Sequence, residues 1–410
     1  MKTVLKIFLA FGLAFGSIMA GPATSQAQTT SLTFDQGNSA MEIPFDLASN
    51  LICFQVRVNG SEPAVFILDT GAGYNVIDST FAANIGLDLS DRRVSPRTGA
   101  GYSQLSGLTI SLPGLKVGGQ SAKSQPLAML SPFAGVPLAG ILGYDFIKQF
   151  VFRIDYARSR ISFYDPAGFV YNGKGEQVPF ELAPGLNWPV ITVRIDPEKG
   201  EPRDIRLLID TGAIGPLQIN IPDLCRTTIP NTITMGITGS GMGGVVGRLK
   251  SVSFGRTRLD RPLAVMPEAA AGDTEDPIAK AVNQVSQGNF GGAVLRRFTV
   301  TFDYPKQVMI LEPNRDFGKA MEHDMCGAFI IDQYHPSRGF QVLAVTPGSP
   351  SEKAGVRPGD LITSVDGREA GKISLSQAKD RFRRHGKKIK LAVEREGQKL
   401  DLVFKLQRMI

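Results

Sequence analysis

The tetrapeptide Asp-Thr-Gly-Ala occurs twice in this chain of 410 residues, and this duplication constrains the fold more than any other feature. The copies are Asp69-Thr70-Gly71-Ala72 and Asp210-Thr211-Gly212-Ala213, which lie 141 residues apart. Each copy directly follows an apolar run, as expected where a buried strand leads into a tight loop. One buried aspartate is costly, whereas two that meet across an interface can share a proton.

The repeat extends well beyond the tetrapeptide. Residues 143–156 align without a gap to residues 291–304 at an offset of 148 residues, and residues 161–163 align to residues 309–311 at the same offset. Repetition on this scale indicates two homologous units. A twofold-like arrangement of two units brings the same loop of each unit to the axis. The sequence therefore predicts two lobes, with Asp69 beside Asp210.

Paired carboxylates have a definite chemistry. Both cannot ionise cheaply in one site, so the pair holds a single proton. The ionised partner can take a proton from water, and the protonated partner can donate to the carbonyl oxygen under attack. Asp69 and Asp210 are therefore the candidate catalytic residues for amide hydrolysis, and this chemistry needs no metal and no cofactor.

Other site types fit the sequence less well. The segment from Gly239 to Gly244 satisfies G-x-G-x-x-G, but a β-rich stretch follows it where a dinucleotide site needs a helix. The histidines, His323, His335 and His385, all lie outside the repeat. This excludes a Ser-His-Asp triad and a histidine-based metal site within the two units.

The repeated elements resemble the pepsin and retropepsin superfamily of aspartic proteases. The resemblance covers residues 40–313 and rests on the two Asp-Thr-Gly-Ala loops, the glycine-rich segments that follow them, and Ile141-Leu142-Gly143. It implies a mainly β fold with two pseudo-twofold-related β-barrel lobes, residues 40–170 and 176–313, and a peptide or protein substrate in the cleft between them. It also implies active-site loops and two flap hairpins. The loop residues are Thr70, Gly71, Ala72, Thr211, Gly212 and Ala213, with the threonines cross-linking the loops, and the flap residues are Gly99, Gly101, Tyr102, Gly239, Gly241 and Gly243.

Lobe two departs from that pattern in two places. Asn289-Phe290-Gly291 stands where lobe one has Ile141-Leu142-Gly143, and Pro216, which cannot donate to a strand ladder, follows the second loop. We expect the segment around Pro216 to be displaced and the second half-site to be distorted. A catalytically inactive peptide-binding protein with a degenerate cleft therefore stays open as the alternative to an active endopeptidase.

A third module begins near residue 326. The stretch from Pro347 to Gly367 resembles the PDZ domain of bacterial envelope proteases, and the resemblance covers residues 326–408. It implies a β-sandwich with two helices, which we expect near residues 352–355 and 375–385. Asp366-Gly367 is typical of a tight hairpin turn. The resemblance also implies a C-terminal peptide ligand that pairs with a strand of the domain. Its expected contacts are Arg338, Gly339, Phe340 and Val342.

Positive charge is concentrated in this last module. Residues 328–410 carry 16 Lys and Arg against 9 Asp and Glu. A solvated helix face is the ordinary interpretation, and a surface that attracts acidic peptides or membrane headgroups is the alternative. We expect no nucleic-acid partner.

The N-terminus has the pattern of an export signal. Lys2 and Lys6 precede an apolar stretch that ends at Ala20, and Ser25-Gln26-Ala27 offers a small-x-small cleavage site. Residues 1–27 are therefore predicted to be a signal peptide of a periplasmic or secreted protein, with no transmembrane span and with a monomeric mature form. Three scattered cysteines, Cys53, Cys225 and Cys326, are expected to be buried apolar residues rather than a redox or zinc motif.

Overall fold

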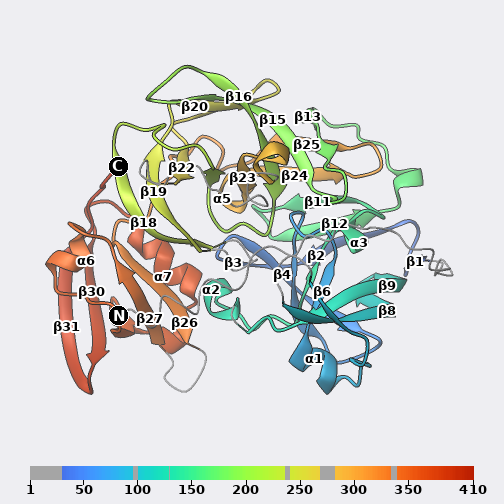
Figure 1. Cartoon of the computed structure of the whole chain (residues 1–410), viewed down its shortest axis with the longest axis horizontal. Helices are drawn as coiled ribbons and strands as arrows, with labels where there is room; N and C mark the ends of the chain where they lie inside the picture. The colour runs from blue at the N-terminus through green and yellow to red at the C-terminus, as the bar shows by residue number, and fades with distance from the viewer. Residues whose placement is uncertain (1–29, 96–99, 129, 236–240, 268–281, 334–338) are drawn as a thin grey trace.

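The computed structural model describes residues 30–95, 100–128, 130–235, 241–267, 282–333 and 339–410 (Figure 1). The predicted signal peptide lies outside these residues. Strands dominate the described chain, which confirms the mainly β class. The strands form four sheets, one for each of the two repeated units, one that the two units share, and one for the C-terminal module.

Lobe one is built on a nine-stranded sheet. Its order is β1 (Ser31–Phe34), β9 (Leu115–Gln125), β6 (Asn75–Asp78), β10 (Gly140–Leu142), β5 (Ala64–Leu68), β4 (Leu51–Val58), β8 (Gly101–Leu112) and β7 (Arg92–Val94), with β3 (Asp46–Ala48) on β4. Strand β8 also pairs with β9, so the sheet curls back on itself. Helix α1 (Ser79–Asn84) follows β6, and the Asp78 carboxylate caps it by accepting from two of its N–H groups.

Lobe two repeats this arrangement in a ten-stranded sheet. Its order is β18 (Thr228–Met235), β19 (Gly241–Arg248), β22 (Leu263–Met266), β17 (Leu217–Ile219), β23 (Gly288–Gly291), β16 (Arg203–Asp210), β15 (Pro189–Asp196), β20 (Ser251–Phe254) and β21 (Thr257–Asp260), with β14 (Glu181–Leu182) on β15. Among the described residues no pairing joins the two ends of this path. The closed barrel implied by the resemblance stays a prediction for this lobe.

A six-stranded sheet joins the lobes, which the sequence did not predict. Its order is β13 (Glu176–Pro179), β25 (Val308–Pro313), β24 (Phe298–Asp303), β11 (Val151–Asp155), β12 (Arg160–Tyr164) and β2 (Ser39–Pro44). At its centre β11 and β24 run antiparallel, and Arg153 pairs with Thr301. These two residues are equivalent in the repeat, since they are separated by its offset of 148 residues. The pseudo-twofold axis therefore passes between them.

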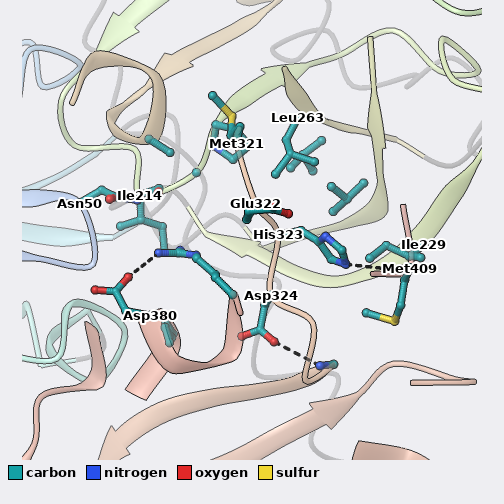
Figure 2. Close-up of a pocket in the computed structure, with 18 of the residues that line it drawn as sticks. Asn50, Ile214, Ile229, Leu263, Met321, Glu322, His323, Asp324, Asp380 and Met409 are labelled. Carbon is teal, nitrogen blue, oxygen red and sulfur yellow. Dashed lines mark hydrogen bonds and ion pairs between the residues drawn. The ribbon is translucent and has the colours of Figure 1, made fainter. Parts of the chain in front are cut away.

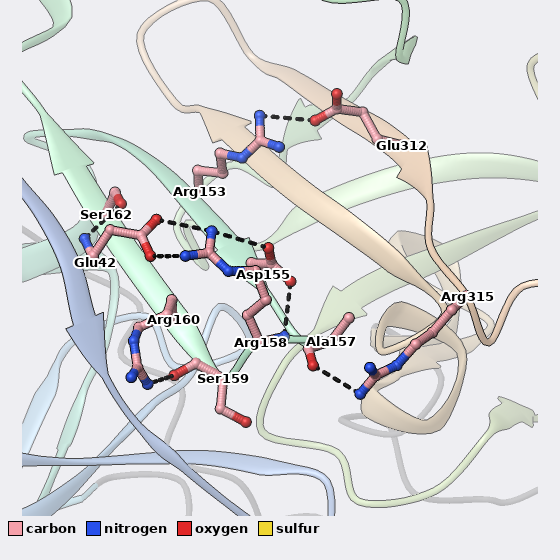
Figure 3. A network of polar contacts seen from close by, with 10 residues as sticks. All are labelled: Glu42, Arg153, Asp155, Ala157, Arg158, Ser159, Arg160, Ser162, Glu312 and Arg315. Carbon is pink, nitrogen blue, oxygen red and sulfur yellow. Dashed lines mark hydrogen bonds and ion pairs between the residues drawn. The ribbon is translucent and has the colours of Figure 1, made fainter.

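Apolar packing holds this shared sheet together. Phe152 and Phe302 face each other across β11 and β24, fully buried, with stacked rings whose centroids are 4.9 Å apart. Figure 3 shows the polar contacts near the same strands, including an ion pair of 2.9 Å between Arg153 and Glu312. Both charged side chains are about a third exposed, so this pair contributes little beside the aromatic core.

The C-terminal module has its own sheet and its own core. The sheet order is β26 (Ala328–Gln333), β27 (Gly339–Val345), β28 (Leu361–Val365), β30 (Lys388–Arg395) and β31 (Gln398–Lys405), with β29 (Arg368–Glu369) on β28. The helices are α6 (Pro350–Lys353) and α7 (Leu375–Phe382), and the second is shorter than predicted. Asp366 and Gly367 both have positive φ, as their two-residue hairpin turn requires.

Two further expectations can be compared with the described residues. Cys53, Cys225 and Cys326 are buried, as predicted, and all three are free thiols. No helix in the described ranges is long and apolar enough to cross a membrane. The short helices α3 (Tyr144–Ile147) and α5 (Gly292–Leu295) follow the two repeated glycines, Gly143 and Gly291, and so mark the same point in each lobe.

Candidate active site

Each Asp-Thr-Gly-Ala loop leaves the end of a strand that lies parallel to a second strand of its own lobe. In lobe one β5 is parallel to β10, and in lobe two β16 is parallel to β23. Both second strands lead to a glycine that has no room for a side chain. A Cβ atom on Gly143 would lie 2.3 Å from the carbonyl oxygen of Tyr74, and one on Gly291 would lie 2.5 Å from that of Gly215. The glycine is needed because the strands cross here at backbone contact.

The departures in lobe two do not change this crossing. Strand β17 begins directly after Pro216 and is antiparallel to β23, just as β6 is antiparallel to β10. Pro216 delays the start of the strand by one residue relative to Asn75, which opens β6. The displacement expected from the proline is therefore limited to that one position.

The two threonines join the loops. Thr70 and Thr211 are fully buried, and each hydroxyl accepts the other residue's backbone N–H at 3.0 Å. Each hydroxyl also donates into the opposite lobe, Thr70 to the carbonyl of Ile209 and Thr211 to the carbonyl of Leu68. Four hydrogen bonds thus hold the loops in one arrangement beneath the aspartates.

This arrangement brings Asp69 and Asp210 together. Their carboxyl groups are hydrogen-bonded to each other, and the residues are only 6% and 8% exposed. Each carboxyl also lies over the glycine of the opposite loop. A Cβ atom on Gly212 would lie 2.4 Å from Asp69 Cγ, and one on Gly71 would lie 2.9 Å from Asp210 Cγ. The glycines therefore leave the space in which the carboxyl groups meet.

Backbone donors and burial set the electrostatics of the pair. The N–H of Gly71 donates to Asp69 Oδ1, and the N–H of Gly212 donates to Asp210 Oδ1, both at 2.8 Å. Burial raises the pKa of Asp69 to about 6, because the charged form loses its hydration. Burial also raises the pKa of Asp210, and the negative charge of Asp69 raises it further. The pair therefore keeps one proton up to a higher pH than isolated carboxyl groups would.

A further residue reaches the pair from lobe two. The side-chain amide of Asn289, on β23, donates to Asp210 Oδ2 at 2.8 Å. The sequence marked this position, because a polar residue replaces the apolar Ile141 of the first repeat, but the replacement was interpreted as a distortion. The structure shows instead that it supplies a hydrogen-bond donor to the candidate dyad.

The glycine-rich segments form hairpins in both lobes. In lobe one β7 and β8 pair Arg93 with Tyr102 and Val94 with Gly101. In lobe two β18 and β19 pair Met235 with Gly241, and Gly243 also lies in β19. The remaining predicted flap glycines, Gly99 and Gly239, lie outside the described residues.

The base of the first hairpin is tied to the Asp69 loop. The ammonium group of Lys123 lies 3.9 Å from the ring centroid of Tyr74 and 4.7 Å from that of Tyr102. Tyr74 closely follows the Asp69 loop, and Tyr102 belongs to the predicted flap. Cation–π attraction at these distances links the hairpin to the candidate site.

The C-terminal module offers a different strand for peptide binding than the one predicted. Gly339, Phe340 and Val342 lie in β27, which pairs with β26 on one side and β28 on the other. A peptide cannot add to a strand whose two edges are already paired, so the prediction that it pairs with β27 is wrong. The edge of this sheet beside β27 is β26, and β31 lies at the opposite end. Arg338 lies outside the described residues.

Lobe one covers part of that edge. The helix α2 (Ser131–Ala134) packs against β26, as Figure 1 shows. The ring centroids of Phe133 and Phe329 are 6.3 Å apart, and the backbone N–H of Ser49 donates to Ser376 Oγ on α7 at 2.6 Å. Lobe one thus contacts both the edge strand and the helix beside it.

A pocket of about 450 Å³ continues from this edge toward lobe two (Figure 2). Part of its wall is Phe329 and Ile330 of β26, together with Lys379 and Arg383 of the α7 region. The lining also includes Ile214, which directly follows the second active-site loop. The carboxyl group of Asp324 lines the same pocket and accepts from the N–H groups of Cys326 and Gly327.

Models of two protein families match separate segments of the chain. The sequence model described as aspartyl protease matches residues 54–146, and the model described as PDZ domain matches residues 341–395. The chain therefore combines a segment similar to aspartyl proteases with a segment similar to PDZ domains. The matched protease segment holds Asp69 and ends beside Gly143, at α3. The second half of the site therefore rests on the geometry described above.

Curated relatives share a limited stretch with this chain. The periplasmic pH-dependent serine endoprotease DegQ of Escherichia coli (strain K12) is 36% identical over 85 residues, 21% of this chain and 18% of that protein. The periplasmic serine endoprotease DegP of Salmonella typhimurium is 32% identical over 101 residues, 25% of this chain and 19% of that protein. The chain thus matches about a fifth of the length of these relatives.

Two solved structures of aspartic proteases resemble the chain. An aspartic proteinase from Irpex lacteus is 12% identical with a TM-score of 0.42, over 69% of this chain and 99% of that one. A retropepsin-like aspartic protease from Rickettsia conorii is 17% identical with a TM-score of 0.24, over 33% of this chain and 93% of that one.

Among the described residues no group of His, Cys, Asp or Glu side chains could hold a metal ion.

Proposed function

We propose that this protein is an aspartic endopeptidase in which Asp69 and Asp210 activate a water molecule. The observation that carries the proposal is the meeting of the two carboxyl groups, each over the glycine of the opposite loop. Two structural turn aspartates would gain nothing from this contact, because burying a pair of carboxyl groups is costly. The threonine cross-links keep that costly arrangement in place.

The chemistry follows from the single proton of the pair. The ionised carboxylate takes a proton from water as the water oxygen attacks the peptide carbonyl carbon, and the protonated partner donates its proton to the carbonyl oxygen. The resulting tetrahedral diol collapses when a proton passes to the amide nitrogen and the C–N bond breaks. One chain supplies both aspartates, so a monomer suffices for activity. The two glycine-rich hairpins would cover a substrate that lies extended between the lobes.

The test is hydrolysis of a peptide library by the full-length protein, with and without pepstatin. Asp69→Asn and Asp210→Asn should each reduce cleavage to the background rate while leaving the melting temperature within a few degrees of the parent. Asp260→Asn is the matched control, because the Asp260 carboxylate lies exposed on β21. If the Asp69→Asn and Asp210→Asn variants cleave peptides as fast as the parent does, the proposal is wrong. A parent that binds peptides without cleaving them would establish the inactive alternative.

We also propose that the PDZ domain recruits or positions the substrate through β26. An added peptide strand needs the free edge of the sheet, and the neighbouring pocket wall carries the cationic side chains of Lys379 and Arg383. A C-terminal carboxylate would meet these two cations, because Asp324 already occupies the N–H groups of Cys326 and Gly327. Matched free-acid and amidated peptides separate carboxylate capture from binding of an internal strand. Tighter binding of the free acid, lost in Lys379→Met, is the expected result.

Export is the third part of the proposal. The predicted signal peptide, residues 1–27, would deliver the mature domains, residues 40–170, 176–313 and 326–408, to the periplasm or the medium. N-terminal sequencing of the protein recovered from the periplasmic fraction tests this directly. A mature chain that begins near Gln28 is expected, whereas a cytoplasmic chain that still begins at Met1 would contradict it.

A further inference from the structure

The two aspartates differ in their side-chain support. Asp210 accepts a hydrogen bond at each oxygen from its own lobe, at Oδ1 from the N–H of Gly212 and at Oδ2 from the amide of Asn289, both at 2.8 Å. Asp69 accepts the equivalent backbone bond at Oδ1 from Gly71. Within the described part of the chain, the side-chain amide of Asn289 donates to Asp210 and no side-chain amide donates to Asp69.

The difference follows from one position of the repeat. Ile141 and Asn289 are equivalent, since they are separated by the repeat offset of 148 residues and each pairs with the second residue before its aspartate, Ile67 or Leu208. The Ile141 side chain is 4% exposed and belongs to an apolar cluster. An isoleucine has no donor, so the same place in lobe one offers only apolar contact.

The residue after each loop glycine is alanine, Ala72 or Ala213, and an alanine side chain cannot donate a hydrogen bond to the neighbouring aspartate. We propose that Asn289 is a positioning residue that orients and stabilises the ionised carboxylate of Asp210. It supplies the side-chain donor that Ala213 cannot supply. This inference rests on the proposed peptidase function and deepens it. Residue 289 looked like a defect of lobe two, and the inference gives it a role in the reaction.

The physical reason lies in the chemistry of the amide. A side-chain N–H₂ group can donate to a carboxylate at every pH, because it neither gains nor loses a proton in the working range. A hydrogen bond to a charged acceptor in a buried site is stronger than one between neutral groups. Burial and the negative charge of Asp69 both raise the pKa of Asp210, and a hydrogen bond donated to the ionised carboxylate opposes that rise. Asn289 therefore stabilises the ionised form of Asp210 against these two effects.

The experiment is the pH dependence of kcat/KM for cleavage of a peptide selected from the library. Asn289→Leu removes the donor at similar volume, so ionisation of the dyad becomes harder and the acidic limb should move to higher pH by about 0.5–1 unit. Adding Ala213→Ser to Asn289→Leu returns a side-chain donor to the lobe that carries Asp210, so most of the shift in the acidic limb should be reversed. Asn220→Leu is the control, because the amide of Asn220 bonds to Asn283 on the same lobe instead of to an aspartate.

A merely structural role for Asn289 would lower stability or kcat without moving the limb. An acidic limb of Asn289→Leu that superimposes on that of the parent therefore overturns the inference. If that variant does not fold, two milder variants decide the same point. Ala72→Ser should move the limbs of the profile to lower pH by more than Ala213→Ser, since Asp210 already accepts from the side-chain amide of Asn289. Equal shifts, or a larger shift for Ala213→Ser, would equally overturn it.

Failure of the inference can be told from failure of the proposed function. If the parent protein shows no peptide cleavage that requires Asp69, the peptidase proposal is wrong and this inference loses its basis. If the parent cleaves peptides but substitution of residue 289 does not move the limbs of the pH profile, the peptidase proposal stands and only the role of Asn289 is wrong.

Discussion

Thr70 and Thr211 hold each other's loop in place. The Thr70 hydroxyl accepts the N–H of Thr211, the Thr211 hydroxyl accepts the N–H of Thr70, and both distances are 3.0 Å. Each hydroxyl then donates to a carbonyl at the end of the opposite strand, at Ile209 or Leu68. The two lobes are therefore joined directly beneath the aspartates by groups that no water reaches.

Removing one hydroxyl from this pair should be costly. Thr70→Val keeps the shape but leaves the N–H of Thr211 and the carbonyl of Ile209 buried without their partner, so we expect a loss of about 2–4 kcal/mol in the free energy of unfolding. Urea unfolding measures this loss. Thr70→Ser is the control, since it keeps the hydroxyl, and it should lose much less. Similar losses in both variants would indicate that packing of the methyl group matters more than the hydrogen bonds.

The glycines of the two loops should tolerate no side chain. Gly212→Ala places a Cβ atom 2.4 Å from Asp69 Cγ, so the carboxyl groups must separate, and we expect peptide cleavage to fall at least 100-fold. The control is Gly318→Ala, because a Cβ atom at Gly318 meets nothing within 4 Å. Cleavage assays of both variants, with melting temperatures recorded beside them, test the prediction. A Gly212→Ala enzyme of parental activity would contradict the placement of Asp69.

The dyad should make stability depend on pH. Folding raises the pKa of Asp69 from its ordinary value of 3.8 to about 6 because of burial, and raises that of Asp210 in the same direction. A raised pKa contributes stability that is present below the unfolded value and is lost as the pH rises through the folded value. Asp69→Asn abolishes that titration. The variant should therefore gain about 1–3 kcal/mol over the parent at pH 7, and the gain should disappear below pH 4.

Urea unfolding at both pH values measures this difference. Asp260→Asn is the control, since it makes the same change at an exposed carboxylate on β21. A gain for Asp69→Asn that is the same at both pH values would point to an effect unrelated to the shared proton.

The contact between lobe one and the PDZ edge should limit access to β26. Phe133→Ala removes the ring that packs near Phe329, so the edge amides of residues 328–333 should exchange with deuterium several-fold faster. Val170→Ala is the control, because Val170 is 72% exposed and lies in lobe one away from β26. Unchanged exchange in Phe133→Ala would mean that α2 does not protect this edge.

Much of this architecture could be predicted from local pattern. The duplicated Asp-Thr-Gly-Ala and the repeat offset were enough to expect two lobes with Asp69 beside Asp210, because a twofold-like pair must bring equivalent loops together. The turn at Asp366-Gly367 was likewise predictable, since it depends on residues close in sequence. The three cysteines were expected to be buried apolar residues, and they are buried.

Position within a sheet could not be predicted in the same way. The apolar pattern of β27 is that of a strand, but whether a strand is interior or at the edge depends on which strands pair with it, and those lie elsewhere in the chain. The peptide edge was therefore assigned to the wrong strand. The shared sheet of β11 and β24 was missed for the same reason, although its residues had been recognised as part of the repeat.

The sequence by itself determined the chemistry that we propose for this protein, because the identity and duplication of Asp69 and Asp210 are properties of the chain. Only the tertiary structure decided how that chemistry is supported. Asn289 is 79 residues from Asp210, and in the sequence it is simply a polar residue at an apolar position of a strand. Folding places its amide 2.8 Å from the carboxylate of Asp210. A hydrogen bond between distant residues leaves no trace in local composition, since it depends on strand pairing and on the direction of one side chain.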